Sequence, residues 1–471
     1  MSKRRSATGR GTADFWRQTV LTIRELRRRK PLQLSPGTIQ PAPKPREIGS
    51  SPGIWSHQTA EAVSPAQLRE YHRRQDQAVL AAGPYPTDRY AGRGIVMVAG
   101  GTRYFTCAWV CLSLLRRVHG CALPVQVWYR GRVEMSDEMI DLLDRFGVEC
   151  IDLLEHGEGH SASQMRGWES KAYALLHSRF KEVILLDADV VPLRDPSDLF
   201  NLPRYQQTGA VFWPDINTLP PHAPIWDICR VPYRDEPEFE SGQIVVDKEQ
   251  TWEALHLALH LNELSSFYYK YLRGDKDTFH LAWRMLRLEY AMPPYWPGLL
   301  YGRRSSRDPF PLPILEQYDF EGRALFQHLA GRTKWTAWGE NMKVPGLQHE
   351  VACREALAEL RDEWTGWPVQ LPAPEILPSS TGALNCPCRF LYCRLGSGRR
   401  VLEFLADGAI GVGTDLLERT WSVNRHGEDA VLTIAGEYGP TCALRQDADG
   451  VWRGQWLRFE QMPVDLIPLS A

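Results

Sequence analysis

The sequence predicts an α/β fold, with a doubly wound nucleotide-binding sheet followed by a small C-terminal antiparallel β-domain. From Gly94, apolar strand-like runs alternate with amphipathic helical segments, as in parallel sheets joined by crossover helices. The run Val183–Leu186 ends in two carboxylates, Asp187 and Asp189, and open α/β sheets bind their ligands beyond the carboxyl ends of strands. Near the C-terminus, short strand-like runs are separated by turn dipeptides such as Asp449-Gly450, which are typical of antiparallel hairpins.

The elements of the expected sheet follow one another along the chain with short connections. Four strands are expected at Ile95–Ala99, Val125–Tyr129, Val148–Leu153 and Val183–Leu186. Gly100–Arg103 is expected to form a tight loop after the first strand. Helices are expected at 64–82, 105–118, 136–146, 168–177, 252–264 and 278–288, with Ser136 as the cap of the third. Further strands are expected at 210–213, 243–246 and 325–328. The Pro-rich stretch 291–313 is expected to be irregular.

Composition divides the 471 residues into four segments. Residues 1–50 begin basic and end Pro-rich, so a largely disordered tail is expected there. Residues 64–360 carry the α/β pattern, and with 43% hydrophobic residues the chain can bury a large core. A Pro- and Ser-rich linker is expected at 361–384. The short strand-like runs at 385–471 predict a small all-β domain.

Charge is distributed unevenly along the chain. The formal net charge of −2 argues against general nucleic-acid binding, but residues 1–50 hold twelve Lys and Arg against three Asp and Glu. A helix at Ala13–Lys30 would suit peripheral contact with an anionic membrane surface, although a solvated tail is favoured. No run approaches the ~20 apolar residues of a membrane span, and no apolar core follows the basic start as it would in a signal peptide.

The ten cysteines do not have the spacing of a small disulfide-rich protein. Cys107, Cys111 and Cys150 lie in apolar patterns where buried thiols are usual. Cys386–Cys388 and Cys393 would form a metal or redox cluster, which is disfavoured because a fourth ligand and the usual two-residue spacing are missing. A reducing, cytoplasmic location is therefore expected, with the inner face of a membrane as the site of any peripheral contact.

The pattern Asp-x-Asp occurs three times, and its surroundings distinguish the three copies. Asp447–Asp449 leads into Gly450, as in a hairpin turn, and Asp275–Asp277 lies between helical stretches. Only Asp187 and Asp189 follow an apolar strand. Two carboxylates at a strand end can hold a hard cation such as Mg²⁺ or Mn²⁺, which neutralises a diphosphate. This pair therefore predicts an enzyme with a nucleotide-linked substrate.

Three further segments carry groups that a metal-dependent glycosyltransferase needs. Glu240–Gln243 precedes an apolar run, Gly274–Phe279 opens a helix, and His328–Trp335 follows a short strand. His328 would serve as a third metal ligand, and Lys334 would serve as a cation on the departing diphosphate. Such an enzyme also needs a polar group near the anomeric carbon to orient the acceptor hydroxyl.

The span from about Gly94 to His349 resembles retaining glycosyltransferases of the GT-A fold. It looks closest to the family 71 α-mannosyltransferase group and is more distantly similar to family 8, which includes glycogenin-like enzymes. His328 and Lys334 match the family 8 segment His-x-x-Gly-x-x-Lys-Pro-Trp, except that Trp335 follows the lysine directly. The resemblance implies that His328 is a metal ligand and that Lys334 binds phosphate.

The remaining site residues are assigned on the same basis. Asp275 and Asp277 match the Asp-Gln-Asp segment of family 8, with Lys276 in place of the Gln. Asp277 and Glu240 are the expected catalytic carboxylates, close to the donor sugar and the acceptor. The expected metal ligands are Asp187, Asp189 and His328. The residues expected to bind the nucleotide part of the donor are Ala99, Gly100, Gly101, Thr102, Arg103, Lys171, Asp187, Ala188 and Lys334.

Several of these residues also have a purely structural alternative. His328 alone would more often be a core histidine, but its position six residues before Lys334 favours the metal site. Lys171 could be a solvated helix residue, and Glu240 could act as a cap or pair with an arginine. Asp277 could be the N-cap of the helix that begins at Thr278.

The predicted function is metal-dependent transfer of a hexose, with mannose favoured, from a nucleotide diphosphate sugar to a hydroxyl acceptor with retention of configuration. The expected donor is GDP-mannose or a UDP-hexose, the acceptor a glycan or another hydroxyl compound, and the cofactor Mn²⁺ or Mg²⁺. A sugar nucleotidyltransferase is an alternative, because Gly100–Arg103 resembles part of that family's Gly-rich loop, but no lysine follows it before Lys171. A non-catalytic protein that binds carbohydrate through the β-domain is the other alternative.

Overall fold

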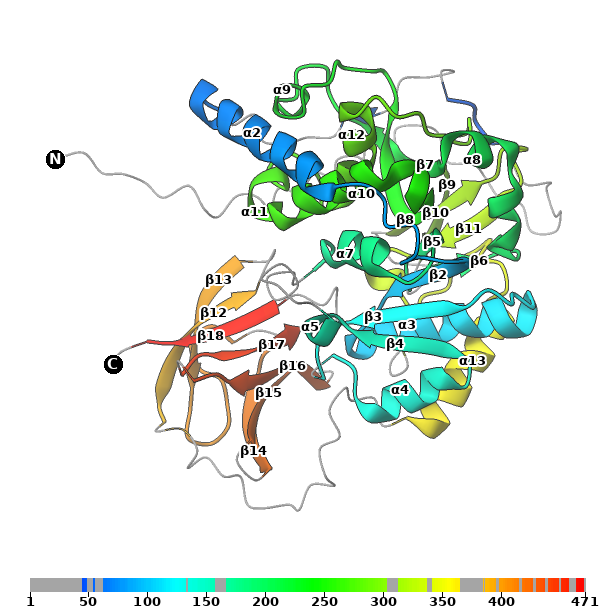
Figure 1. Ribbon diagram of the computed structural model, residues 1–471. Coiled ribbons are helices and arrows are strands. Elements are labelled where there is room, and N and C mark those ends of the chain that lie inside the picture. The colour runs from blue at the N-terminus through cyan, green and yellow to red at the C-terminus, as the bar shows by residue number, and fades with distance from the viewer. Residues whose placement is uncertain are drawn as a thin grey trace, which may run out of the picture. The chain divides into compact units, whose positions relative to one another are not determined.

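The structure is a computed structural model of the chain, shown in Figure 1. It describes residues 45–48, 54–55, 62–132, 134–156, 167–302, 312–336, 341–364, 384, 386–394, 398–414, 417–426, 429–436, 439–448, 450–456 and 463–469. By its internal contacts the chain divides into one unit that spans Lys44–Gln370 and another that contains Leu371–Ala471. Each unit is described by itself.

The larger unit is built on a seven-stranded mixed sheet with the strand order β1-β7-β8-β5-β2-β3-β4. Its strands are β1 (Ile54–Trp55), β2 (Arg93–Val98), β3 (Val125–Tyr129), β4 (Val148–Asp152), β5 (Glu182–Leu186), β7 (Ala210–Thr218) and β8 (Pro237–Asp247). The four strands β5, β2, β3 and β4 are parallel, as predicted. Strand β8 is antiparallel to both β5 and β7, so the sheet is not parallel throughout. The α/β class itself is confirmed.

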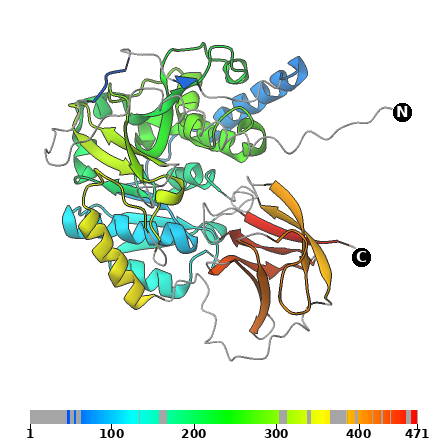
Figure 2. The same cartoon turned by 180° about the vertical axis from the view of Figure 1, so that it is seen from behind.

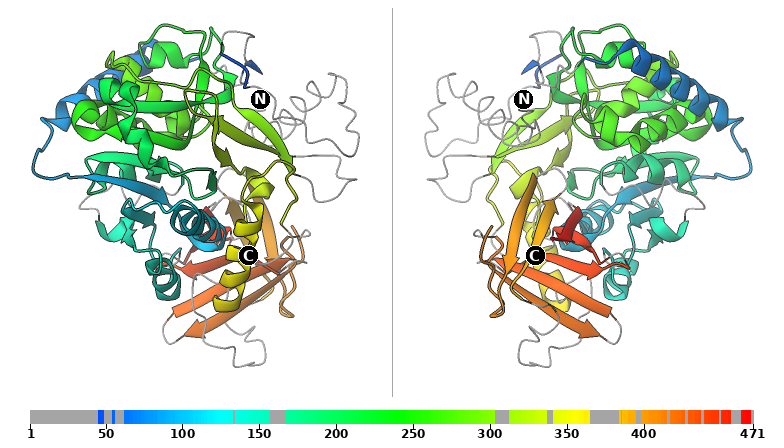
Figure 3. Two further views of the ribbon diagram at one scale, coloured as in Figure 1. Left: turned by 90° about the vertical axis from the view of Figure 1, so that its right-hand side faces the viewer. Right: turned by 90° about the vertical axis from the view of Figure 1, so that its left-hand side faces the viewer.

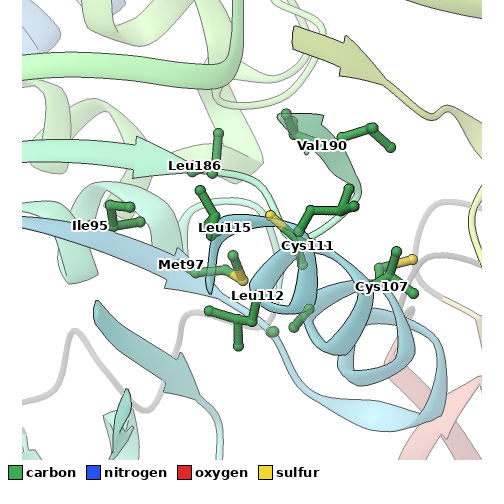
Figure 4. Close-up of a cluster of buried hydrophobic side chains, with 14 of the residues drawn as sticks. Ile95, Met97, Cys107, Cys111, Leu112, Leu115, Leu186 and Val190 are labelled. Atoms are coloured by element: carbon green, nitrogen blue, oxygen red, sulfur yellow. The ribbon is translucent and has the colours of Figure 1, made fainter. Parts of the chain in front are cut away.

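Two hydrophobic cores cover the two faces of this sheet. Alternate residues of β5 point to opposite faces: Ile184 and Leu186 enter one core, and Val183 and Leu185 enter the other. This arrangement explains why the strand reads as a continuous apolar run in the sequence. Figure 4 shows part of the first core, where Ile95 and Met97 of β2 lie beside Cys111, Leu112 and Leu115.

The helices lie on both faces of the sheet. On one face α3 (Gly101–Ser113) packs against α13 (Glu350–Glu363), which Figure 2 shows in cyan and yellow. On the other face α10 (Lys248–Glu263) packs against α2, α7 and α12, and Figure 3 shows α2 along this green helical layer. Other α-helices among the described residues of this unit are α2 (Pro65–Ala82), α4 (Asp137–Asp144), α5 (Leu153–His156), α7 (Ser170–His177), α8 (Pro203–Thr208), α9 (Ile225–Ile228), α11 (Ser265–Tyr268) and α12 (Lys276–Met285).

Two local predictions on this unit are wrong. The expected loop Gly100–Arg103 is largely helical, because α3 already begins at Gly101 and continues into a π-helical turn, Leu114–Val118. A glycine suits position 100, directly before this helix, since a Cβ there would lie 2.6 Å from the carboxylate of Glu134. The stretch 291–313 is not wholly irregular, since it contains β9 (Gly298–Gly302) and the start of β10 (Leu312–Tyr318).

A second, four-stranded sheet in the same unit has the order β6-β11-β10-β9. Strand β6 (Val190–Pro192) follows β5 after only three residues, and β11 (Ala324–His328) pairs antiparallel with it. In this register His328 lies opposite Val190. The end of β11 is therefore held directly beside the turn between β5 and β6.

The smaller unit has its own seven-stranded antiparallel sheet, of order β13-β12-β18-β17-β16-β15-β14. Its edge strands are linked through Ile410, which bridges to Phe404, and Ala409, which bridges to Thr420. Its core contains Trp421 and other buried aromatic and aliphatic side chains, so the predicted antiparallel β-domain is confirmed. The strands are β12 (Cys388–Arg394), β13 (Gly398–Phe404), β14 (Thr420–His426), β15 (Asp429–Gly436), β16 (Gly439–Gln446), β17 (Trp452–Trp456) and β18 (Pro463–Pro468).

Few of the described residues bear on the N-terminal predictions. The expected helix Ala13–Lys30 and the rest of residues 1–44 lie outside the described residues. Residues 45–48, which fall in the tail expected to be largely disordered, pair with residues 294–296: Ile48 N–H donates to Pro294 O at 2.9 Å, and Trp296 N–H donates to Arg46 O at 2.7 Å. Within the described part of the chain, no helix combines the length and apolar character that crossing a membrane requires.

Candidate active site

The carboxylates of Asp187 and Asp189 are held in the turn between β5 and β6. The N–H of Asp187 donates to Gly242 O at 2.8 Å, which extends the pairing of β5 with β8 by one residue. The N–H of Val190 then closes the turn on Asp187 O at 3.1 Å. The N–H of Leu329 donates to Asp189 O at 3.1 Å, so β11 fixes the other side of the turn. Both carboxylates therefore lie on rigid backbone at the carboxyl end of a buried strand.

His328 completes a group of three potential metal ligands. Its Nε2 lies 3.2 Å from Asp189 Oδ1 and 3.9 Å from Asp187 Oδ2. One ligand atom from each of the three side chains lies within 4.8 Å of the others. Carboxylate oxygens together with an imidazole nitrogen suit Mn²⁺ and related divalent ions, so the residues present fit the predicted metal.

Two lysines neutralise the Asp pair. Lys171, on α7, places its Nζ 2.7 Å from Asp187 Oδ2, donates to Ser241 Oγ at 3.1 Å, and lies 3.5 Å from Asp275 Oδ2. Lys334 places its Nζ 2.7 Å from Asp189 Oδ2. Both lysine side chains are nearly buried, and charged groups are buried at such positions only when they are paired.

The electrostatic environment separates the two aspartates. Burial raises the pKa of Asp187 to about 6, against the opposing effect of Lys171. For Asp189 burial also acts upward, but Lys334 and His328 outweigh it and hold the pKa below its usual value. Burial disfavours the imidazolium of His328, yet the carboxylates of Asp189 and Glu240 raise its pKa well above the usual value. A metal bound here would therefore have to displace a proton from His328.

Glu240 lies on β8, within reach of His328. Its Oε1 is 3.2 Å from His328 Nδ1 and accepts the N–H of Gly242 at 2.8 Å. Burial tends to raise the pKa of Glu240, but His328 and Lys171 lower it to about 2. The structure thus brings Glu240 together with the three potential metal ligands. Its ionic partner is His328, where the structural alternative expected an arginine.

The structure places Asp277 in a second ionic cluster, around Lys276. The Nζ of Lys276 lies 2.8 Å from Asp277 Oδ2, 2.5 Å from Glu238 Oε2 and 3.2 Å from Asp215 Oδ2. Asp277 also accepts the N–H of Phe239 at 3.0 Å, and its side chain is fully buried. Its carboxylate therefore joins α12 to β8. Asp277 is not the N-cap of this helix, because α12 begins at Lys276 and Asp275 precedes it.

The segment predicted to bind the nucleotide lies at the start of α3. The N–H of Ala99 donates to Trp128 O at 2.9 Å, and that of Gly101 donates to Glu134 O at 2.6 Å. Arg103 donates to Gly331 O at 2.7 Å, so its guanidinium braces the loop that carries Lys334. Gly100 lies between these residues, Ala188 is buried between the two aspartates, and the side chain of Thr102 lies outside the described residues.

Sequence reasoning gave Ser241 no role at the site, and it placed Tyr104 only in the segment Ala99–Tyr104, which was expected to cradle the nucleotide. Ser241 accepts a hydrogen bond from Lys171, and the hydroxyl of Tyr104 accepts one from Lys334 at 2.9 Å. The ring of Tyr104 also lies 4.5 Å from the same ammonium. The segment Glu240–Gln243 was the available signal for Ser241, whereas the contact of Tyr104 with Lys334 depends on tertiary packing that no local pattern shows.

Cys386, Cys388 and Cys393, considered as a possible metal or redox cluster, belong to the smaller unit. Cys386 Sγ and Cys388 Sγ are 3.5 Å from each other, and the Sγ of Cys393 contacts Leu391 O at 3.9 Å. All ten cysteines lie in the described part of the chain, and all are free thiols.

The α/β unit combines an Asp-x-Asp turn, a histidine and two buried lysines. These groups make the site a candidate for binding a metal ion and a diphosphate. The family described as "Mannosyltransferase putative" matches residues 92–229 and 232–328, about half of the chain. The chain belongs to this mannosyltransferase family. The matched region contains β5, the Asp pair and His328.

Curated relatives agree with this assignment. The α-1,2-mannosyltransferase MNN21 of Candida albicans is 28% identical over 255 residues, which cover 42% of this chain and 38% of that protein. The α-1,2-mannosyltransferase MNN5 of Saccharomyces cerevisiae is 25% identical over 297 residues, which cover 50% and 48% of the two chains. The matched segments thus span less than half of either relative. The predicted resemblance to α-mannosyltransferases is confirmed.

Among solved structures, the chain is similar to glycosyltransferases. The galactosyltransferase LgtC, in a complex with donor and acceptor sugar analogues, is 13% identical with a TM-score of 0.35. That comparison covers 62% of this chain and 100% of LgtC.

Proposed function

We propose that the chain is a metal-dependent α-mannosyltransferase, which transfers mannose from GDP-mannose to a hydroxyl of a glycan or another acceptor with retention of configuration. The observation that carries this proposal is the cluster of Asp187, Asp189 and His328 between Lys171 and Lys334. Such a cluster offers hard ligands for a divalent cation together with ammonium groups for a diphosphate. Membership of the mannosyltransferase family supports mannose as the sugar.

The chemistry follows from where charge develops during glycosyl transfer. Cleavage of the bond between the anomeric carbon and the diphosphate leaves negative charge on the diphosphate and an oxocarbenium-like sugar. A divalent ion held by Asp187, Asp189 and His328 would neutralise that diphosphate when bound. Lys334 would add a second positive charge for a phosphate oxygen, and its ammonium contacts the ring and hydroxyl of Tyr104. Lys171 maintains the charge balance of Asp187.

The two predicted carboxylates have different surroundings in this proposal. Glu240 faces His328. Asp277 is fully buried, bound to Lys276 and accepts the N–H of Phe239, so it joins α12 to β8. A direct contact of either carboxylate with the sugar stays a prediction.

A thermal-shift screen of the full chain against GDP, UDP and CDP tests the donor class. With Mn²⁺ present, the proposal expects GDP to raise the melting temperature more than UDP or CDP, because only a nucleotide that binds the native state stabilises it. EDTA should remove the shift and added Mn²⁺ should restore it. An equal shift with UDP would contradict GDP as the donor base, and a shift insensitive to EDTA would contradict metal dependence.

Pyrophosphate release distinguishes the rival enzyme class. A sugar nucleotidyltransferase releases pyrophosphate from a nucleoside triphosphate and a sugar phosphate, whereas the proposed enzyme releases GDP from GDP-mannose. The cytoplasmic location and the contact of the basic N-terminal segment with a membrane stay predictions, since residues 1–44 lie outside the described residues.

A further inference from the structure

His328 is held between two carboxylates from different strands. On one side its Nε2 faces Asp189 in the turn after β5, at 3.2 Å. On the other side its Nδ1 faces Glu240 of β8, also at 3.2 Å. The two nitrogens of the ring are therefore assigned to different partners, one to a potential metal ligand and one to a residue outside that group.

The carboxylate of Glu240 is itself fixed. Its Oε1 accepts the N–H of Gly242, two residues along the same strand, at 2.8 Å. The side chain is nearly buried, with 11% of its surface exposed. A carboxylate with a fixed orientation can hold an imidazole in one rotamer and favour the tautomer that carries a proton on Nδ1.

Gly242 makes this contact possible. A Cβ at position 242 would lie 2.6 Å from His328 Nδ1 and 3.1 Å from Glu240 Oε1. The first approach is closer than Cβ atoms come to other heavy atoms and the second is tighter than usual, so a side chain there would force the imidazole to shift. The backbone of β8 is thus shaped for the Glu240–His328 pair.

We infer that Glu240 is a positioning residue, which binds His328 through Nδ1 and so directs His328 Nε2 at the metal. This inference rests on the proposed metal-dependent function. Metal-ligating histidines commonly donate their second N–H to a carboxylate, and loss of such a partner typically weakens metal binding about 10- to 100-fold. A contact of Glu240 with the sugar would instead change substrate kinetics and leave metal affinity intact.

The test measures Mn²⁺ affinity of the full chain by calorimetry, with no nucleotide present. Glu240→Ala is expected to weaken Mn²⁺ binding about 10- to 100-fold, and Glu240→Gln, whose amide oxygen can still accept from Nδ1–H, is expected to weaken it less. The Glu240→Ala/His328→Ala double variant should bind Mn²⁺ no more weakly than His328→Ala alone, because Glu240 acts through His328. Pulsed EPR of bound Mn²⁺ should show coupling to a histidine nitrogen in the wild type and lose it in His328→Ala.

Glu238→Gln is the matched control, because Glu238 lies on the same strand but binds Lys276. It should leave Mn²⁺ affinity unchanged. Wild-type affinity in Glu240→Ala, or additive losses in the double variant, would overturn the inference and leave the metal-dependent function standing. A wild-type chain without Mn²⁺ affinity would overturn both. The melting temperature of each metal-free variant shows whether it has folded, and Glu240→Gln keeps the test decisive if Glu240→Ala has not.

Discussion

Lys171 is the residue on which the buried charge balance of the site depends. Its ammonium lies 2.7 Å from Asp187 Oδ2 and 3.5 Å from Asp275 Oδ2, and only 10% of the side chain is exposed. Removal of one member of a buried ionic group leaves an uncompensated charge, which costs more than loss of a surface pair.

Lys171→Met is therefore expected to lower the free energy of unfolding by about 3–5 kcal/mol, measured by urea denaturation in EDTA. The matched control is Lys181→Met, since Lys181 pairs with Glu249 at the surface. Exposed pairs contribute about 0–1 kcal/mol. Equal losses in the two variants would show that Lys171 does not carry the buried charge balance.

A second prediction at the residue scale concerns histidines near α10. Burial lowers the pKa of His177 to about 3 and that of His256 and His260 to about 4, with neighbouring positive charges adding to the effect. The groups facing His177 are His156, Arg89, Lys248 and His256. In the unfolded chain these histidines return to a pKa near 6.5.

The unfolded state therefore binds more protons than the native state between about pH 6.5 and pH 3. Stability from these groups is complete above pH 6.5 and is lost as the pH falls through that window. His177→Phe should reduce the slope of melting temperature against pH between 6.5 and 4. A slope unaltered by His177→Phe would refute this origin of acid sensitivity.

At the scale of elements, the site depends on how three strands meet. Strand β5 and its terminal carboxylates could be predicted from the sequence, because the apolar run and the Asp pair are neighbours in the chain. The contact of His328 with Asp189 spans 139 positions. It depends on the register in which β11 pairs with β6, and no local pattern encodes that register.

Tertiary packing also decides two features that the local sequence does not show. Glu240 was identified as a polar residue before an apolar run, but its contact with His328 requires β8 to pair antiparallel with β5. Gly100–Arg103 has the glycines of a loop, yet the buried face of α3 extends the helix back to Gly101. Of these two, only the expectation for Gly100–Arg103 was wrong, because tertiary packing overrode its local preference.

At the scale of the whole molecule, each unit has a core of its own. Leu112 is buried in the larger unit and Leu432 in the smaller unit, both with no exposed surface. Substitution of a buried leucine by alanine costs about 2–5 kcal/mol through lost burial and the remaining cavity. Calorimetry should therefore resolve two unfolding transitions.

Leu432→Ala is expected to lower the melting temperature of one transition, and Leu112→Ala that of the other. Each variant serves as the control for its counterpart. A single transition that both variants shift equally would mean that the two units unfold cooperatively as one.

Turnover of GDP-mannose is the measurement that tests the proposed function most directly. Transfer of labelled mannose to a mannoside acceptor should require Mn²⁺ or Mg²⁺ and should stop with EDTA. Asp187→Asn and Asp189→Asn should each lower kcat by at least about 100-fold, as expected when a group that stabilises developing charge is removed. Full turnover by both variants, or transfer unaffected by EDTA, would contradict the assignment of Asp187, Asp189 and His328 as the centre of the site.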